Sequence, residues 1–461
     1  MDRVSRAVIA LTMLFVFSWP VRQVRAEGLE QAWGIALQIN DRLQSQQILS
    51  TAAGSDLSAA KRARLPTVNT QNYNFLLSNA PTVNLGGAGM SPSTGLPHYF
   101  GLFGANQNDL PISLTFATVP LYTGGKLLRD IDAAGYRVNT QRNEEFRSAL
   151  DLKLIVAESY IGVLRARRNL EVAKSNVKQL SSFAKDVKSR REQGLVIRSD
   201  DLAAEVSLRN AQIGEIQAAN ALKTAWATYN RYLCRALDTV VDLDELSNVP
   251  ATDADWKALA EQAMEANSDS MEMNESELAA MTRQAMRRPE PASLTSQAQT
   301  LGAQAESTLS NIRPQVGIGG GFAFLGAQGL APQGYGAMMV SANWTFSDFG
   351  ATRRRTAAIR QREYATLKQR ADLEADIALQ VRTRWIDLQT AHLRVPVARI
   401  AVVQSEENNK VLLARYRQEL STYPEVLDAE NRRILSLNNF YNSLYDESLA
   451  FFRLHRAVGD L

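Results

Sequence analysis

The feature that most constrains this chain is an internal duplication. Tyr122–Lys126 aligns with Ser347–Ala351 at an offset of 225 positions, and no gap is needed from there to Ala204, which meets Ala429. At the same offset, apolar residues of the first half meet apolar residues of the second, beginning with Val156, Tyr160, Ile161, Val163 and Ala166. Before this stretch, Leu65–Val68 matches Arg313–Val316. An ordered series of matches indicates two copies of one supersecondary unit.

Each copy is predicted to contain a helix, two strands, a very long helix, a turn and a returning helix. The long helices are expected at about 126–191 and 351–417, because both stretches are rich in strong helix formers. Apolar residues in the first one step by four and three, as in a coiled coil: Leu150, Leu154, Ala157, Ile161 and Leu164. Roughly 65 helical residues span about 100 Å, which is too long for a globular core. The returning helices are expected at 200–236 and 425–458.

Four short segments alternate apolar with small or polar residues and predict β-strands. The clearest are Ile112–Ala117, Val316–Phe324 and Met338–Phe346, and Val68–Leu77 is weaker. One apolar face suits a wall in contact with lipid, although the half-buried strands of a soluble sheet share the pattern. Four strands leave two free edges and cannot close around a lumen. Several copies are therefore expected to share one barrel, and the arithmetic permits two, three or four.

The first 26 residues have the pattern of a secretory leader. Arg3 and Arg6 precede the apolar stretch Ala7–Trp19, and Val24–Ala26 is a small-residue cleavage site. The leader holds four of the 51 Lys and Arg residues and one of the 48 Asp and Glu residues, so the mature chain is expected to be neutral. A neutral chain gives no indication of nucleic-acid binding.

Catalytic and metal-binding patterns are not found. His98, His392 and His455 are far apart, the lone Cys234 permits no disulfide framework, and no nucleophile–base motif or phosphate loop occurs. Gly319–Gly321 lies inside a strand pattern rather than between a strand and a helix. We therefore predict that the protein is not an enzyme and has no cofactor or metal site.

Short motifs recur where the predicted elements join. They are Leu29–Ala32, Leu65–Pro66, Pro120–Gly125, Gly194–Leu195, Ser199–Leu202 and Glu425–Ala429. In order and spacing, this series resembles the TolC-like outer-membrane efflux family over essentially the whole mature chain. The resemblance implies a mixed α and β membrane fold: four strands per chain in a trimeric twelve-stranded outer-membrane β-barrel, continued by a long periplasmic α-helical barrel.

The same resemblance implies a domain division. It comprises a leader (1–26), a first helix (27–65), a β-hairpin with a long extracellular loop (66–122), a periplasmic helical hairpin (123–236), an equatorial connector with the first helix of the second copy (237–313), a second β-hairpin (314–347) and a second helical hairpin (348–461).

The implied function is a passive exit duct of a tripartite efflux pump or type I secretion system in the cell outer membrane. The implied partners are two further copies of the chain, a periplasmic adaptor, an inner-membrane transporter and outer-membrane lipid. Nothing in the sequence selects among drugs, metals, metabolites and proteins as cargo. A periplasmic adaptor remains an alternative, as does a non-conducting structural or adhesive envelope protein.

The resemblance also implies a periplasmic gate at the hairpin tips. Glu425 and Asp428 would form an acidic ring, and the alternative is that they are solvated charges favoured by the dipole at a helix N-terminus. Tyr416 and Asp200 would form a latch. The adaptor would contact the tip residues, which are Gly194, Leu195, Glu419 and Leu420. Glu419 departs from the family's usual glycine, and Ser421 stands where the family has a further basic link.

Overall fold

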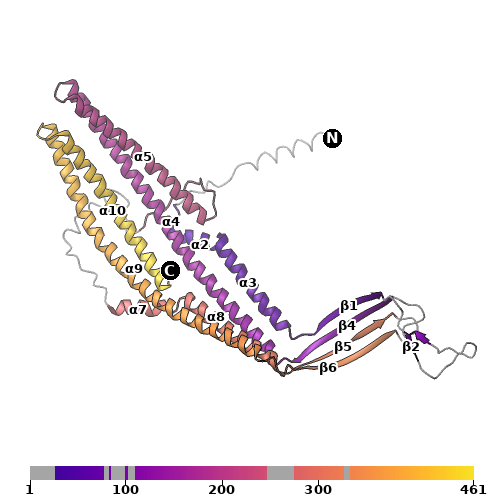
Figure 1. Cartoon of the computed structure of the whole chain (residues 1–461). Coiled ribbons are helices and arrows are strands. Elements are labelled where there is room, and N and C mark those ends of the chain that lie inside the picture. The colour runs from indigo at the N-terminus through magenta and orange to yellow at the C-terminus, as the bar shows by residue number, and fades with distance from the viewer. Residues whose placement is uncertain (1–25, 77–81, 85–98, 102–108, 247–274, 327–332) are drawn as a thin grey trace, which may run out of the picture. The chain divides into compact units, whose positions relative to one another are not determined.

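The computed structural model describes residues 26–76, 82–84, 99–101, 109–246, 275–326 and 333–461 (Figure 1). The predicted leader and most of the predicted long loop lie outside these residues. The chain divides into two compact units, and both take segments from both copies. One unit comprises Met1–Asp41, Ala149–Ala279 and Val381–Leu461, and the other comprises Arg42–Ser148 and Ala280–Gln380.

The unit that contains Arg42–Ser148 holds an antiparallel sheet in the order β1-β4-β5-β6 (Figure 1). Its strands are β1 (Thr67–Leu76), β4 (Asp109–Tyr122), β5 (Gln315–Leu325) and β6 (Gly334–Asn343). The four predicted strands are therefore confirmed. A separate short pair, β2 (Thr82–Asn84) and β3 (Tyr99–Gly101), was not predicted. Within the described chain, β1 and β6 each have one edge without a neighbouring strand.

The register of the sheet corrects the expectation of one apolar face. Phe116 of β4 pairs with Gly321 of β5, and Thr115 pairs with Phe322. Paired residues lie on the same face of a sheet. The large apolar residues of β4 therefore lie on one face and those of β5 lie on the other. The alternation within each strand is as predicted. Both faces of the sheet nevertheless carry large apolar residues, and each is interrupted by glycine or polar side chains.

Helices in this unit include nearly all of α3 (Asp41–Arg62), the second part of α7 (Glu275–Ala285) and α8 (Pro289–Leu309), which a single 3-10 turn, Ser310–Ile312, extends. Side chains of α8 bond to the long helix α4 (Lys126–Glu192), where the Ser293 hydroxyl donates to Glu144 at 2.8 Å. A buried ion pair at the start of α8 joins Arg288 and Glu290 at 2.6 Å. The equatorial connector is thus helical after residues 247–274, which lie outside the described chain, whereas residues 237–246 before them form no helix.

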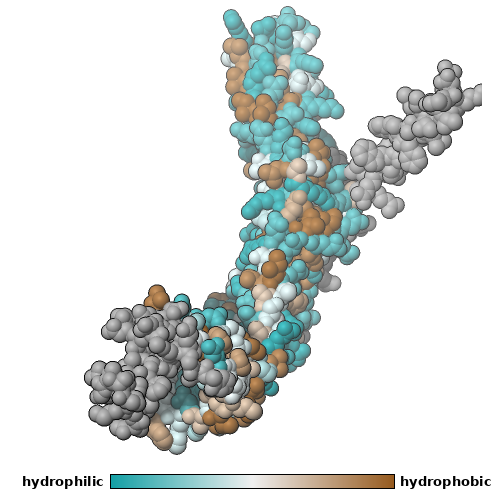
Figure 2. Space-filling view, turned by 90° about the vertical axis from the view of Figure 1, so that its right-hand side faces the viewer, coloured by the Kyte–Doolittle hydropathy of each residue, from teal (hydrophilic) through white to brown (hydrophobic). Residues whose placement is uncertain are grey.

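The other unit is helical. Its elements include α2 (Leu29–Ile39), α5 (Arg198–Tyr232) and α10 (Tyr423–Val458), with the distal parts of α4 and of α9 (Ala351–Arg417). The predicted long helices are confirmed as α4 and α9, which have 67 residues each. None of the described helices combines the length and apolarity needed to cross a membrane. Figure 2 shows apolar residues exposed among hydrophilic ones over the visible face.

The core of this unit follows the predicted coiled-coil seam. Leu150, Ala157, Ile161 and Leu164 are at most 3% exposed, whereas Leu154 is half-buried. The returning helix α5 ends at Tyr232 rather than at the predicted residue 236. Cys234 adopts a left-handed φ of 50°, and the Arg235 N–H bonds back to the Asn230 carbonyl, which terminates the helix.

Ion pairs join α4 to α10 within this unit. Arg165 contacts Asp446 at 2.6 Å, and Arg456 contacts Asp151 at 2.6 Å. The guanidinium of Arg456 is 9% exposed, so its pair is better shielded from water than most surface pairs. These contacts fasten the first helical hairpin to the second.

A polar clasp holds Glu27 at the start of the described chain. The carboxylate of Glu27 accepts two hydrogen bonds from the Arg235 guanidinium, at 2.7 and 2.9 Å. Its backbone N–H donates to the Asp242 carbonyl at 3.0 Å. The buried Tyr160 hydroxyl donates to the Glu27 carbonyl at 2.9 Å. Bidentate and backbone bonds together fix both the position and the direction of this segment.

Candidate functional site

The candidate site is built on two helix-to-helix turns, one in each copy. After α4, the Leu195 N–H bonds to the Arg190 carbonyl and the Gly194 N–H bonds to the Arg191 carbonyl. The turn after α9 repeats both bonds, with Leu420 and Glu419 as donors. This is the Schellman arrangement, in which one residue is left-handed. Gly194 has φ 78°, and its counterpart Glu419 has φ 63°. Glu419 thus occupies a conformation that favours glycine.

An apolar cluster packs directly behind the turns. Its buried members come from α4, α5, α9 and α10, and they are Phe183, Val187, Ala204, Tyr416, Tyr423 and Val426. The Phe183 ring stacks on Tyr423 with centroids 5.7 Å apart and meets Tyr416 edge-on at 5.2 Å. The Tyr423 hydroxyl and the Ser207 hydroxyl are 2.9 Å apart and share a hydrogen bond. Burial and aromatic contacts therefore bind the two hairpins together at this end.

Arg190, in the last turn of α4, reaches the end of α9. Its guanidinium donates to the carbonyl of Tyr416 at 3.2 Å and to that of Arg417 at 2.8 Å. It also lies over the Tyr416 ring, 5.4 Å from the centroid. These are carbonyls that a helix C-terminus leaves without an intrahelical donor, and a cation there also complements the helix dipole.

The predicted acidic ring residues both have local partners in one copy of the chain. The Glu425 carboxylate accepts from the Ser421 hydroxyl at 2.5 Å and from the Thr422 backbone N–H at 2.9 Å. These bonds, with the Ser421 bond the strongest, hold the pKa of Glu425 below its ordinary value. Glu425 thus completes a capping box at the start of α10. Asp428 pairs with Arg432 at 2.8 Å, and both side chains are exposed.

The predicted latch residues lie near each other, but no hydrogen bond joins them within one subunit. Tyr416 is 7% exposed, and its hydroxyl has no hydrogen-bond partner among the described residues. Burial raises the pKa of Tyr416, the Arg190 cation lowers it, and the Asp200 charge raises it further. The adjacent Asp201 pairs with Arg191 at 3.0 Å. Tyr416 therefore retains an unused donor close to a carboxylate.

The predicted adaptor-contact residues sit at the turns themselves. Leu195 is 55% exposed and Leu420 is 63% exposed. Each follows the left-handed residue of its turn, so the backbone geometry presents both leucines in the same way. The two tips thus each present one exposed leucine at an equivalent position.

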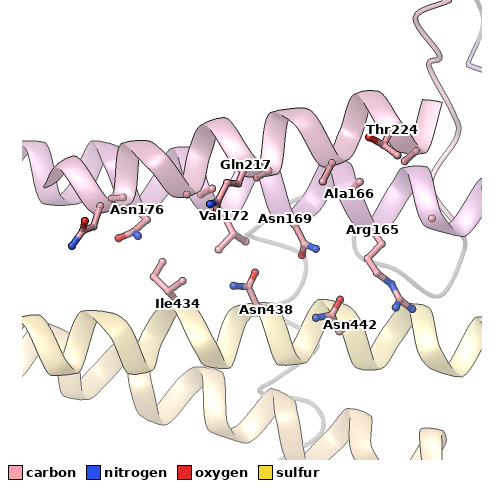
Figure 3. Close-up of a pocket in the computed structure, with 18 of the residues that line it drawn as sticks. Arg165, Ala166, Asn169, Val172, Asn176, Gln217, Thr224, Ile434, Asn438 and Asn442 are labelled. Carbon is pink, nitrogen blue, oxygen red and sulfur yellow. The ribbon is translucent and has the colours of Figure 1, made fainter. Parts of the chain in front are cut away.

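A groove of about 1210 Å³ lies farther from the turns, between α4, α5 and α10 (Figure 3). Figure 3 shows Asn169 of α4 and Asn438 of α10 directed into the space between these helices. The side-chain oxygens of Asn169, Asn176 and Asn438 are buried and have no partner in the described part of the chain. Helix α5 contributes small residues to the groove, among them Ala211, Gly214 and Ala218. The groove offers amide groups and no cluster of charges. Across the described residues, no group of three His, Cys, Asp or Glu side chains could hold a metal ion.

Sequence reasoning missed Phe183, Arg190 and Tyr423, which make the main contacts between the hairpins. It also missed the bond from Ser421 to Glu425. Thr422 and Glu425 stand three residues apart in the spacing of a capping box, so this signal was present in the sequence. The contacts of Arg190 depend on the packing of two hairpins distant in sequence, and no local pattern predicts them.

Comparisons with known proteins agree with one another. Residues 33–234 match the family model described as outer membrane efflux protein. No curated protein matches the chain. The outer-membrane channel OprN has 15% identity and a TM-score of 0.73, over 94% of this chain and 90% of its own. The outer membrane protein VceC of Vibrio cholerae has 14% identity and a TM-score of 0.72, over 94% and 96%. The MtrE outer membrane channel of Neisseria gonorrhoeae has 14% identity and a TM-score of 0.69, over 94% and 88%.

Proposed function

We propose that the chain is an outer-membrane channel with a periplasmic helical extension, similar to the outer membrane efflux proteins whose family model matches residues 33–234, and that three copies form its conducting unit. The observation that carries this proposal is the pair of free sheet edges. A four-stranded sheet in a bilayer leaves the backbone groups of β1 and β6 unpaired, at several kcal/mol each. Three copies supply twelve strands, and a closed barrel has no edges.

Exposed apolar stripes on the helices support the same assembly. On α5, Leu202, Val206, Ile213 and Ile216 are each more than half exposed and follow the spacing of a helix face. On α9, Ile386, Leu393 and Ile400 recur every seven residues and are also exposed. Ile161 of α4 is the counterpart of Ile386, and it is buried within its own subunit. We expect neighbouring copies to cover the α5 and α9 stripes.

We further propose that this duct is passive and receives cargo from an inner-membrane transporter through a periplasmic adaptor. The exposed leucines Leu195 and Leu420, with Gly194 and Glu419 beside them, form the proposed adaptor contact. The sequence carries no phosphate-binding loop, so the energy for transport is assigned to the transporter.

At the proposed gate, Glu425 and Asp428 from three copies would form a ring of six carboxylates. Their local bonds do not exclude this role, because both side chains remain exposed and the lowered pKa of Glu425 favours its charged form. Such a ring favours cations over anions. Tyr416 and Asp200 would form the latch. The supporting observation is that the Tyr416 hydroxyl has no hydrogen-bond partner among the described residues of its own subunit.

The conducting function is tested with the full chain purified from outer-membrane fractions. We expect a trimer by chemical cross-linking and ion conductance in planar lipid bilayers. A lipid-inserted single polypeptide would overturn the trimer. A trimer without conductance would favour the non-conducting envelope protein.

The gate is tested separately with charge-neutral variants. Glu425→Gln keeps an acceptor for the capping bonds but removes the charge, and Asp428→Asn is its companion. We expect the double variant to lower cation selectivity and weaken block by divalent cations, while chemical cross-linking still reports trimers. Unchanged selectivity would remove both residues from the gate. Tyr416→Phe should raise the open fraction, because it deletes only the hydroxyl.

A further inference from the structure

The four-stranded sheet contains an internal copy of the contact that must close the barrel. Resting on the trimer proposed above, we propose that the seam between neighbouring subunits repeats the β4–β5 pairing in the same register. The duplication maps β4 onto β6 and β5 onto β1. Both members of the β4–β5 pair therefore have counterparts on the two free edges of the sheet.

The register of the seam follows from the two alignments. β4 maps onto β6 by adding 225, and β5 maps onto β1 by subtracting 248, as set by Leu65–Val68 and Arg313–Val316. In the sheet, Phe116 pairs with Gly321. The same step therefore pairs Ser341 with Tyr73 of the partner subunit.

A second pair defines the same register. Thr118 pairs with Gly319 inside the sheet. The mapping then places Asn343 opposite Gln71 of the partner subunit. Two amide side chains face each other there, and both can donate and accept hydrogen bonds. A slip by one residue would turn every side chain of one strand to the other face.

Side-chain size supports the predicted pairing. A Cβ atom at Gly321 would clash with the Thr115 carbonyl oxygen and lie 2.8 Å from Cδ1 of Phe116, so the Phe116 ring occupies the space above the glycine. Large faces small across this internal pair. In the seam, the small residue is Ser341 and the large one is Tyr73 of the partner subunit. The order is reversed, but large still faces small.

The strand-to-helix junction below the sheet carries a second, independent sign of the seam. Gly124 has φ 63°, and a Cβ atom there would lie 2.7 Å from Cβ of Arg313. Its counterpart is Phe349, which has φ 53° and a fully exposed side chain. The counterpart of Arg313 is Leu65, which is 57% exposed. The mapping brings Phe349 against Leu65 of the partner subunit.

This junction explains why an aromatic residue occupies a left-handed position in water. Phenylalanine is disfavoured at positive φ, and its exposed ring gains nothing from packing within one subunit. Against Leu65 of the partner subunit, the ring loses contact with water. Phe349 carries a Cβ atom where Gly124 carries only a hydrogen. We therefore expect Phe349 to be farther from Leu65 of the partner subunit than Gly124 is from Arg313.

Disulfide trapping tests the register in full-length trimers, with Cys234→Ser as the background because Cys234 is exposed and free. Ser341→Cys with Tyr73→Cys places both thiols at the predicted opposing positions. The matched controls combine Ser341→Cys with Gln71→Cys or with Phe75→Cys, which keep the same face and slip the register by two. We expect mild oxidation to yield covalent trimer at least several-fold faster for the predicted pair than for either control.

Each outcome is decisive. A faster control pair would replace the proposed register. No disulfide in any pair, while chemical cross-linking still reports trimers, would place the seam elsewhere. Absence of trimers in the background variant itself would overturn the proposed function rather than the register.

Phe349→Gly gives a test that needs no disulfide. The change relieves a strained backbone, so a purely internal role predicts a trimer at least as heat-resistant as the wild type. The seam contact predicts the reverse, with dissociation to monomers in detergent at a lower temperature. A trimer of unchanged or greater heat resistance would remove Phe349 from the seam.

Discussion

The two hairpin tips have the same backbone turn but different side chains. Gly194 and Glu419 occupy equivalent left-handed positions, and both turns make the same pair of main-chain bonds. Phe183 and Arg190 of the first copy pack on the second hairpin, whereas their counterparts Asn408 and Arg415 do not take part in that cluster. The comparison teaches that a duplicated backbone persists while aligned side chains of the two tips make different contacts.

The largest expected difference between the tips is at Phe183. Phe183→Ala removes a buried ring that contacts Tyr416 and Tyr423, so we expect the free energy of unfolding to fall by about 3–4 kcal/mol. Asn408→Ala alters an exposed side chain and should cost less than about 0.5 kcal/mol. Guanidinium denaturation followed by circular dichroism measures both. Equal losses would show that the tips are energetically symmetric.

A smaller difference is expected between the two arginines. Arg190→Ala deletes two hydrogen bonds to the end of α9 and should cost about 1–2 kcal/mol. Arg415→Ala deletes a 3.3 Å bond within its own turn and should cost about 0.5 kcal/mol. Arg190→Lys, which keeps the charge but not the forked geometry, should fall between them in the same denaturation series. A variant of Arg415 as damaging as that of Arg190 would contradict the asymmetry.

Substitutions at the two left-handed residues should change the free energy of unfolding in opposite directions. Gly194→Ala should destabilise the protein by about 1 kcal/mol, since no atom of the described residues lies within 4 Å of the added Cβ and only the backbone is strained. Glu419→Gly should stabilise it by a similar amount. Thermal melting of the two variants and of the double variant tests this pair. Changes of the same sign would mean that the turns are not equivalent.

The smallest effect concerns the pH response of the second tip. The pKa of Glu425 is lowered by its bonds to Ser421 and Thr422, so its charged form stabilises the folded state. This stabilisation is complete at pH values above the ordinary glutamate pKa of about 4.3, which applies in the unfolded state. It is lost as the pH falls through the lowered pKa of the folded state. Melting temperatures of wild type and Glu425→Gln should therefore differ at pH 7 and converge in acid. Asp200, the aligned residue of the first tip, gives the matched control as Asp200→Asn. A difference that widened in acid would contradict the assigned sign.

Much of the architecture could be predicted because it depends on local pattern. The ends of α4 and α9 follow from composition and from the aligned turns. The distribution of apolar residues over the two faces of the sheet could not be predicted, because alternation within β4 does not say on which face the apolar residues of β5 lie. The early end of α5 depends on a left-handed cysteine, which no common cap signal marks.

The candidate site was predicted less completely for a physical reason. The gate, latch and adaptor roles came from motif positions, and they remain predictions about an assembly of several copies. The contacts that the structure adds at Phe183, Arg190 and Tyr423 arise from helices far apart in sequence. A capping box is local, and there the sequence did contain the signal at Thr422 and Glu425.

The clasp around Glu27 has a practical consequence for anyone who labels or purifies this protein. Its main-chain N–H and its carboxylate are both engaged, by Asp242 and Arg235. A peptide tag or dye coupled directly to this residue would compete with those partners and strain the surrounding helices. An exposed helical position such as Asn408, converted to cysteine after Cys234 has been replaced, would carry a fluorophore without loosening the fold.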